Sequence, residues 1–332
     1  MRVVSGIQPT GNLHLGNYLG AIRRWVVMQE EAECFIFLAD LHSLSDYIPA
    51  AERLANVREM AAALIACGLD PDRATLFNQA RVPAHAELCW LLNGTARMGW
   101  LNRMTQWKDK AGKNREGSSV ALFDYPVLQA ADVLLYQATH VPVGEDQKQH
   151  IELIRDIALK FNCDHDTDLF TVPDPHIGET AARIMSLRDG RAKMSKSDLS
   201  DMSRINLADD IDLVAQKVRK AKTDAEPLPE TFDALAERAE ARNLVTIYAA
   251  LADRTPQSVV EEFAGQGFGA FKPRLADLLV ETLRPISARL AQFRTDPGAL
   301  DAVLAAGGAK AAAAAAPTLA GAYRALGLST GH

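Results

Sequence analysis

Two short segments of the sequence combine residue types that suit phosphate chemistry. The first spans residues 6–17 (GIQPTGNLHLGN) and lies where an apolar run gives way to a helical pattern. Glycines let a backbone approach a phosphate closely, and a helix N-terminus offers unpaired N–H groups. The segment matches neither G-x-G-x-x-G nor a P-loop. On its own it therefore fits an ordinary turn as well as a nucleotide site.

The second segment is Lys193-Met194-Ser195-Lys196-Ser197, here called the KMSKS loop. Two lysines at this spacing can reach one polyphosphate, and the serine hydroxyls can bond further oxygens. Such a pair would neutralise the charge of a departing pyrophosphate. A bare K-x-x-K is more often a solvated surface loop, but together with HLGN at His14–Asn17 it is much more specific for a nucleotide site.

The elements that must position these segments are predicted by hydrophobic periodicity. Short apolar runs alternate with patterns that repeat about every 3.6 residues, which predicts βαβ units and a Rossmann-like, doubly wound parallel α/β sheet. Ligands collect at the carboxyl ends of the strands of such a sheet. The predicted strands are residues 2–7, 34–39, 75–80 and 140–143, and the predicted helices between them are 18–29, 51–67 and 147–161.

Beyond about residue 200 only helical patterns remain, so we predict an all-helical C-terminal domain. An alanine-rich tract near the C-terminus predicts a lightly packed terminal helix, because alanine favours helix but buries little area. We therefore expect a catalytic domain at 1–200, a helical domain at 201–300 and a C-terminal helix at 301–332. The helical patterns are residues 211–222, 232–251, 256–264 and 272–293.

The composition is that of an ordinary folded protein. Of the 332 residues, 48% are hydrophobic and 23% are charged, which argues against disorder. The formal net charge of -6 means that a nucleic acid must be held by local basic patches. We find no run of about 18 apolar residues and no basic-then-apolar leader, so we expect a cytoplasmic protein without a membrane span or signal peptide.

HLGN and KMSKS together resemble the two signatures of the class I aminoacyl-tRNA synthetases. Asn17 replaces the last histidine of the usual HIGH form, as in the tryptophanyl branch of that family. The resemblance extends along most of the chain. It includes SGIQPTG at 5–11, RMTQWK at 103–108, YPVLQAAD at 125–132, VPVGEDQKQH at 141–150, ARIMSL at 182–187 and ETLRPI at 281–286.

The resemblance implies ATP as a substrate and Mg²⁺ that arrives with it. Lys193, Lys196 and Lys108 would neutralise the phosphates as catalytic groups. The segment 108–119 is weakly basic and could close over them, although most such runs are merely solvated. The implied ATP-binding residues are Gln8, Pro9, Thr10, His14, Gly16, Asn17, Gly144, Glu145, Asp146, Ile184, Lys193, Met194, Ser195, Lys196 and Ser197. Glu145 and Asp146 are equally suited to capping the helix that follows.

The amino-acid pocket is expected in residues 125–132. Indole presents one N–H donor and no acceptor, so a selective pocket needs a buried acceptor between apolar walls. Asp132 matches the family residue with that role, although a capping or solvated aspartate is the plainer alternative. Tyr125, Gln129 and Gln147 are expected beside the substrate. Gln129 stands where many members have methionine, which leaves tyrosine open as an alternative substrate.

The implied reaction joins L-tryptophan to tRNA(Trp) in two steps, through tryptophanyl-adenylate, in a homodimer. No side chain is required as a covalent nucleophile, and no cluster suggests a tightly bound metal. The resemblance also implies that the helical domain at 201–300 binds the tRNA anticodon. Four of its cations suit RNA phosphates, although a solvated helix face fits them equally: Lys217, Arg219, Lys220 and Lys222. Three alternatives stay open, namely a tyrosyl-tRNA synthetase, a non-catalytic RNA-binding protein and a small-molecule nucleotidyltransferase.

Overall fold

The computed structural model describes residues 1–11, 13–112, 116–142, 148–176 and 183–329. Its centre is a five-stranded parallel sheet with the order β3-β2-β1-β4-β5. The strands are β1 Arg2–Ile7, β2 Glu33–Leu38, β3 Thr75–Asn78, β4 His140–Pro142 and β5 Asp174–His176. Four strands lie where the apolar runs predicted them. The fifth was missed because its three residues contain no apolar run.

Both faces of the sheet are buried, as predicted for a doubly wound fold. Successive strand residues belong to opposite cores: Val3 and Ile36 pack in one, Val4 and Phe35 in the other. Helices α2 (Arg23–Met28) and α3 (Ala50–Ala66) supply side chains to the first core. Helices α4 (Ala84–Asn93), α7 (Val120–Leu134) and α8 (Lys148–Asp164) supply them to the second. The α/β prediction is confirmed.

Short helical segments carry the chain between these elements. The predicted helix at 18–29 is divided, because a π-helical turn η1 precedes α2. The remaining segments are α1 Leu15–Asn17, η1 Tyr18–Ile22, η2 His42–Ser45, η3 Gln79–Arg81, α5 Met98–Leu101, α6 Thr105–Ala111, η5 Asp201–Ser203 and η6 Asp233–Leu235.

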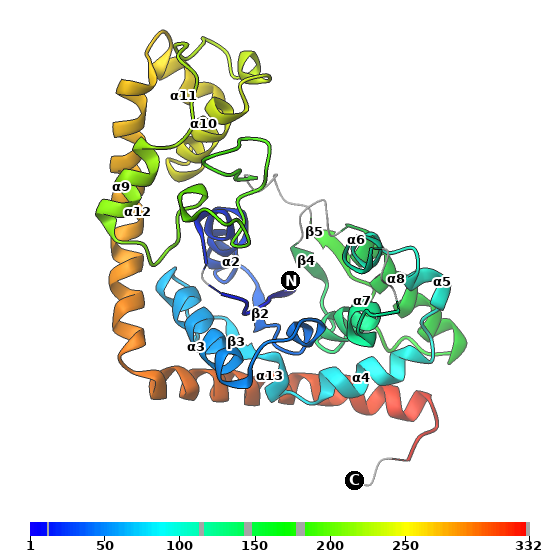
Figure 1. Ribbon diagram of the computed structural model, residues 1–332. Helices are drawn as coiled ribbons and strands as arrows, with labels where there is room; N and C mark the ends of the chain where they lie inside the picture. Colours follow the sequence, from blue (N-terminus) through cyan, green and yellow to red (C-terminus); the bar gives the residue numbers. More distant parts are fainter. Residues whose placement is uncertain (12, 113–115, 143–147, 177–182, 330–332) are drawn as a thin grey trace.

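The described residues beyond position 200 form helices and no named strand, as predicted. They are α9 Ile211–Arg219, α10 Ala239–Leu251, α11 Pro256–Phe263, α12 Phe268–Arg294 and α13 Pro297–Ala325. Helix α12 runs along α9 and continues beside α3, so it joins the helical region to the sheet (Figure 1). Its expected apolar face is buried at Leu275, Leu279, Leu283, Ile286 and Leu290, whereas Phe293 is only partly buried.

Helix α13 crosses below β3 and α4 (Figure 1) and covers the edge strand of the sheet. Leu304 belongs to one core and Ala311 to the other, so the helix passes from one face of the sheet to the other. A Cβ atom on Gly307 would lie 1.8 Å from the carbonyl oxygen of Leu76 in β3. Light packing is therefore wrong for this helix, because its small residues bring two backbones into contact.

Helix α13 is also the one helix in the described ranges that is long and apolar enough, by length and composition alone, to cross a membrane. Lys310 interrupts the apolar sequence of this helix, so it contains no unbroken run of about 18 apolar residues. The contact of α13 with β3 accounts for its composition, since small apolar residues are what close packing on a strand requires.

Candidate functional site

The structure brings the two sequence signatures together. The ammonium of Lys196 donates hydrogen bonds to both the carbonyl and the hydroxyl oxygen of Thr10. A cavity of about 350 Å³ lies between the two segments. It is lined by Ile7, Gln8, Gly11, Leu13, His14, Asn17, Met60, Lys193, Met194, Ser195 and Lys196. Residues at the end of β1 and in α1 line the cavity, so it lies at the carboxyl end of the sheet.

The first segment leaves β1 through a turn that needs glycine. Gly11 adopts φ +87°, a conformation that other residues rarely accept. Pro9 is buried and Gln8 is exposed toward the cavity. The side chain of Asn17 accepts the backbone N–H of His14 at 3.1 Å, which fixes the first helical turn. A Cβ on Gly16 would approach the His14 ring to 3.0 Å, so the ring and the helix backbone are in close contact.

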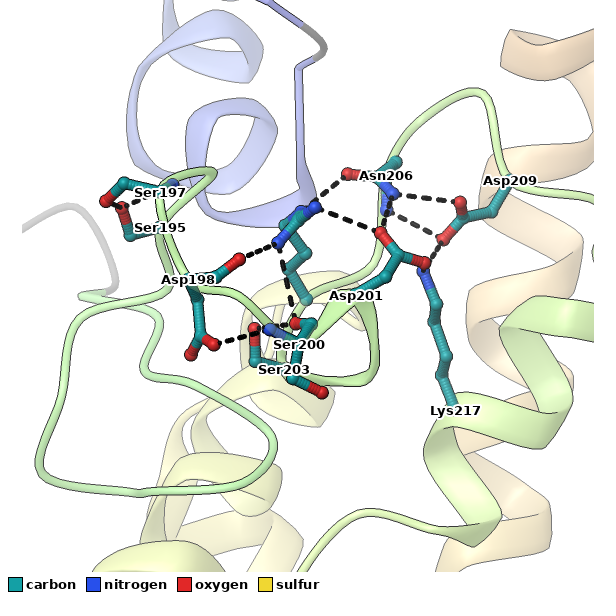
Figure 2. Close-up of polar contacts among 10 residues, drawn as sticks. Ser195, Ser197, Asp198, Ser200, Asp201, Ser203, Asn206, Asp209 and Lys217 are labelled. Atoms are coloured by element: carbon teal, nitrogen blue, oxygen red, sulfur yellow. Dashed lines mark hydrogen bonds and ion pairs between the residues drawn. The ribbon is translucent and has the colours of Figure 1, made fainter.

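The KMSKS loop is held from two sides by backbone hydrogen bonds. On one side, Met185 and Lys193 form an antiparallel bridge, and Met194 donates to the carbonyl of Ile184 at 3.1 Å. Ile184 is therefore buried directly beside the loop. Within the loop, the hydroxyls of Ser195 and Ser197 lie 2.8 Å apart (Figure 2).

On the other side, the chain after the loop pairs with the first segment. Leu15 donates its N–H to the carbonyl of Ile205 at 2.8 Å, and Leu207 donates to the carbonyl of Leu13 at 2.9 Å. His14 and Asn206 form an isolated antiparallel bridge between these two bonds. The positions of the two signatures are thus coupled through the backbone.

Electrostatics at the cavity favour an anion. Burial, followed by the positive charges of Arg204, Lys196 and Lys193, lowers the pKa of His14 to about 4. His14 is only 6% exposed, and no described residue is hydrogen-bonded to its Nδ1 atom. Burial also lowers the pKa of Lys196. Burial disfavours the charged form of both side chains, and the three cations near His14 make further positive charge unfavourable there, which an entering negative group would offset.

We expect His14 to make the stability of the protein depend on pH. Its pKa is lower when folded than the ordinary 6.5, so its contribution is complete above about pH 6.5 and is lost as the pH falls toward 4. The contribution is about 3 kcal/mol. The free energy of unfolding, measured with urea, should fall from pH 7 to pH 4.5 by about 2 kcal/mol less in His14→Gln than in the original protein. Equal losses would contradict the assignment.

Not all expected phosphate-binding residues meet at the cavity. Lys108 lies exposed on α6, and no contact in the described part of the chain joins it to Lys193 or Lys196. Gly144, Glu145, Asp146 and Gln147 lie outside the described residues.

Asp132 lies at the centre of a buried polar cluster and is 1% exposed. Its Oδ2 atom lies 2.7 Å from Nε2 of His42. Its Oδ1 atom accepts from the Gln79 amide and lies close to Nδ1 of His85, both at 2.6 Å. Burial alone would raise the pKa of Asp132, but the charge and hydrogen bond of His42 and the contacts with His85 outweigh it and lower the pKa to about 2. The aspartate is therefore ionised and is not a solvated cap.

An ionised carboxylate offers about four acceptor positions, and these three neighbours occupy three of them. Among the described residues, His42 is the single donor that contacts Oδ2, which leaves one acceptor position on that oxygen. Asp132 can therefore accept one further N–H without displacing a protein partner.

Two expected pocket residues precede Asp132 on α7. Gln129 is half-buried and, three residues away on the helix, lies on the same side as Asp132. The Tyr125 hydroxyl lies 2.5 Å from Nε2 of His150, and burial raises the pKa of this tyrosine.

Sequence reasoning missed the partners of Asp132. Gln79 directly follows β3, and His42 lies a few residues beyond the end of the adjacent parallel strand β2, so their place at the carboxyl ends of the strands pointed to them. No comparable signal marks His85 in the apolar sequence of α4.

The prediction of an RNA-binding basic patch on α9 is wrong for Lys217. The Lys217 side chain is completely buried and paired with two aspartates, so it cannot contact RNA. Lys222 pairs with Glu240 at 2.6 Å. Arg219 and Lys220 are exposed at the end of the helix. The periodicity of α9 places Lys217 on its apolar side, together with Val214 and Val218.

Known proteins resemble the chain over nearly its whole length. The family model for class I tRNA synthetases (W and Y) matches residues 1–284. The tryptophan–tRNA ligase of Caulobacter vibrioides is 60% identical over 320 residues, which are 96% of this chain and 93% of the relative. That of Rhizobium meliloti is 53% identical over 93% of each chain.

Solved structures agree in fold. Tryptophanyl-tRNA synthetase from Campylobacter jejuni, complexed with ADP and tryptophan, has a TM-score of 0.82 and 33% identity, and the match covers 99% of this chain and 100% of that one. The enzyme from Mycoplasma pneumoniae has a TM-score of 0.83 and 33% identity over 99% and 98% of the two chains. The joined signatures and these similarities together show that the chain belongs to the class I aminoacyl-tRNA synthetases, in the tryptophanyl branch of the family of tryptophanyl and tyrosyl enzymes.

Proposed function

We propose that this chain activates L-tryptophan with ATP and transfers it to tRNA(Trp). The observation that carries the proposal is the contact of Lys196 with Thr10 beside a cavity of about 350 Å³. That contact joins two segments 186 residues apart, each of a type suited to phosphate. The relatives named tryptophan–tRNA ligase support tryptophan over tyrosine as the substrate.

In the first step, an oxygen of the tryptophan carboxylate attacks the α-phosphorus of ATP in line. The bond between the α-phosphorus and the bridging oxygen breaks, so tryptophanyl-adenylate forms and pyrophosphate leaves. Negative charge grows on the departing pyrophosphate. Lys193 and Lys196 face the cavity and neutralise that charge, and no protein nucleophile is needed.

Lys196 is suited to this task. Its ammonium has three N–H donors, and Thr10 takes two of them. A phosphate oxygen can be bound by the third donor or can displace the neutral oxygens of Thr10, since hydrogen bonds to charged groups are stronger. Mg²⁺ enters with the nucleotide, held by phosphate oxygens, as is usual for this ion.

Tryptophan specificity depends on Asp132. Its remaining acceptor position on Oδ2 suits the single N–H of indole. His42, Gln79 and His85 hold the carboxylate in one orientation, which leaves no freedom for it to turn away. A phenylalanine side chain would leave that acceptor unsatisfied, and the loss is costly in a buried site.

In the second step, the terminal ribose hydroxyl of tRNA attacks the acyl carbon and AMP leaves. The helices within residues 201–300 form the tRNA-binding region, and the catalytic region spans residues 1–200. The exposed Arg219 and Lys220 remain available for RNA phosphates. With tRNA as its substrate, the protein acts in the cytoplasm.

The proposal is tested by exchange of labelled pyrophosphate into ATP, measured with each standard amino acid. We expect exchange with tryptophan only, because the acceptor of Asp132 and the phosphate site then act together. Equal or faster exchange with tyrosine would overturn the choice of amino acid, and the absence of exchange with any amino acid would overturn the proposed activity.

We expect the active form to be a homodimer. Trp90, Met98 and Val120 are 78%, 67% and 80% exposed, on α4, α5 and α7, and both α4 and α5 pack against α7. Large exposed apolar side chains on neighbouring helices are typical of protein interfaces. Light scattering should give twice the chain mass of 36.1 kDa. A Trp90→Glu/Met98→Glu variant should give the single mass, whereas Leu159→Glu on α8 should not change it.

A further inference from the structure

An ion cluster around the buried Lys217 lies between α9 and the chain that follows the KMSKS loop, with the side chain of Asp209 buried and that of Asp201 half exposed (Figure 2). The Lys217 side chain is 0% exposed. Its Nζ atom lies 2.7 Å from Oδ2 of Asp201 and 2.6 Å from Oδ2 of Asp209. Lysine is almost never buried without paired charges, and such a cluster is weak evidence for stability alone. Its use must be sought in what the two aspartates hold.

Both aspartates hold Asn206. The Asn206 side-chain amide donates to Oδ1 of Asp201 and to Oδ1 of Asp209, each at 3.0 Å. Its backbone N–H donates to Oδ2 of Asp209 at 2.9 Å. The position of Asn206 is thus fixed by three hydrogen bonds to carboxylates that Lys217 itself fixes.

Asn206 is also the residue that pairs with His14 of the first signature. The neighbouring bonds from Leu15 to Ile205 and from Leu207 to Leu13 complete this short pairing. The polar contacts therefore continue from Lys217, through one aspartate and one asparagine, to the segment that lines the ATP cavity.

One of the two aspartates, Asp201, also reaches the end of the KMSKS loop. Oδ1 of Asp201 lies 3.1 Å from the Arg204 guanidinium. Arg204 in turn donates to the carbonyl of Asp198 at 3.0 Å and to that of Ser200 at 3.5 Å. Asp198 directly follows the loop, so these contacts of Arg204 set the direction in which the chain leaves the loop.

We propose that Lys217 is a positioning residue for the KMSKS loop, because the carboxylates it pairs with hold both the exit of the loop and the strand pairing to the first signature. This inference rests on the proposed function. Lys217 is not among the described residues that line the cavity, and the proposal gives it no contact with substrate. It acts through the placement of Lys193 and Lys196 relative to the phosphates, and a misplacement of about 1 Å costs about 100-fold in rate.

The test is a double-mutant cycle in tryptophan-dependent pyrophosphate exchange. We expect Lys217→Met to lower kcat by about 10- to 100-fold and to change tryptophan binding, measured by equilibrium dialysis, by less than about 2-fold. Lys217→Arg should recover most of the rate. In a Lys196→Ala background the further loss from Lys217→Met should fall to less than about 3-fold, because the group it positions is gone. Equal losses in both backgrounds, or an unchanged kcat, would overturn the proposal.

A matched control is Lys160→Met, which removes a lysine from a surface ion pair with Asp164 on α8. It should leave kcat unchanged. If Lys217→Met does not fold, Asp209→Asn replaces it in the cycle, because this variant keeps the Lys217–Asp201 pair and weakens the hold on Asn206. Its kcat should fall, with the same dependence on Lys196.

A second readout does not depend on activity. Hydrogen exchange of the Leu15 and Leu207 amides should accelerate at least 10-fold in the Lys217 or Asp209 variant and remain unchanged in Lys160→Met. Unchanged exchange would overturn the inference even if the rates fell. The original protein's exchange of pyrophosphate with tryptophan provides the baseline, so a failure of the proposed function is recognised separately.

Discussion

We expect Lys196→Ala to lower kcat of tryptophan-dependent pyrophosphate exchange by an amount that corresponds to about 2 to 4 kcal/mol of activation free energy. KM for ATP should change much less. The reason is that the charge on pyrophosphate grows as the bond to the α-phosphorus breaks, so the lysine binds the transition state more strongly than ATP. Among the residues that the structure describes, this ammonium bonds to the two neutral oxygens of Thr10. Steady-state exchange rates at several ATP concentrations separate kcat from KM.

The matched control for this prediction is Lys160→Ala, which removes a lysine outside the cavity and should leave both constants unchanged. A Lys196→Ala protein with a raised KM for ATP and an unchanged kcat would contradict the prediction. Lys196 would then bind ATP and the transition state equally.

We expect Asp132→Asn to lower kcat/KM for tryptophan by an amount that corresponds to a loss of about 1 to 3 kcal/mol in transition-state stabilisation. The amide keeps the size of the carboxylate, and if its oxygen stays toward Gln79 and His85 its NH2 group replaces Oδ2, so both His42 and the indole N–H lose their acceptor. Phenylalanine has no N–H to satisfy, and its slow activation should change little. The ratio of the two kcat/KM values should therefore shrink, while KM for ATP stays nearly constant.

Asparagine is preferred to alanine because Asp132 also holds Gln79 and His85. Alanine would leave these buried donors unpaired and destabilise the fold. Thermal melting must confirm that the variant is folded, and Asp124→Asn on the same helix serves as a control. An unchanged preference in the folded Asp132→Asn protein would mean that selectivity resides elsewhere, with Tyr125 and Gln129 next to be tested.

The sheet could be predicted from the sequence because its strands are buried on both faces and read as unbroken apolar runs, as in residues 34–39. Strand β5 could not, since His140 and its neighbours in β4 provide the pairing that makes Asp174–His176 extended. Only tertiary contacts distinguish such a segment from a loop.

The phosphate site was predictable because its residues occur in two compact segments whose chemistry is local. The cluster at Asp132 was only half predictable, since His42, Gln79 and His85 come from three separate elements. The burial of Lys217 could not be predicted, because a run of cations indicates solvent-exposed side chains. Only the tertiary structure brings two aspartates to one of them.

The position of α13 has a consequence for biosynthesis. Gly307, which contacts the β3 backbone, leaves the ribosome roughly 230 residues after the strand itself, a delay of about 10 to 50 s at bacterial rates. During that time the N–H and C=O groups on the outer side of β3 have no helix over them, and an open strand edge can pair with another chain. Nascent chains released before Gly307 should therefore self-associate, and a helix translated long after β3 is the one that covers its open edge.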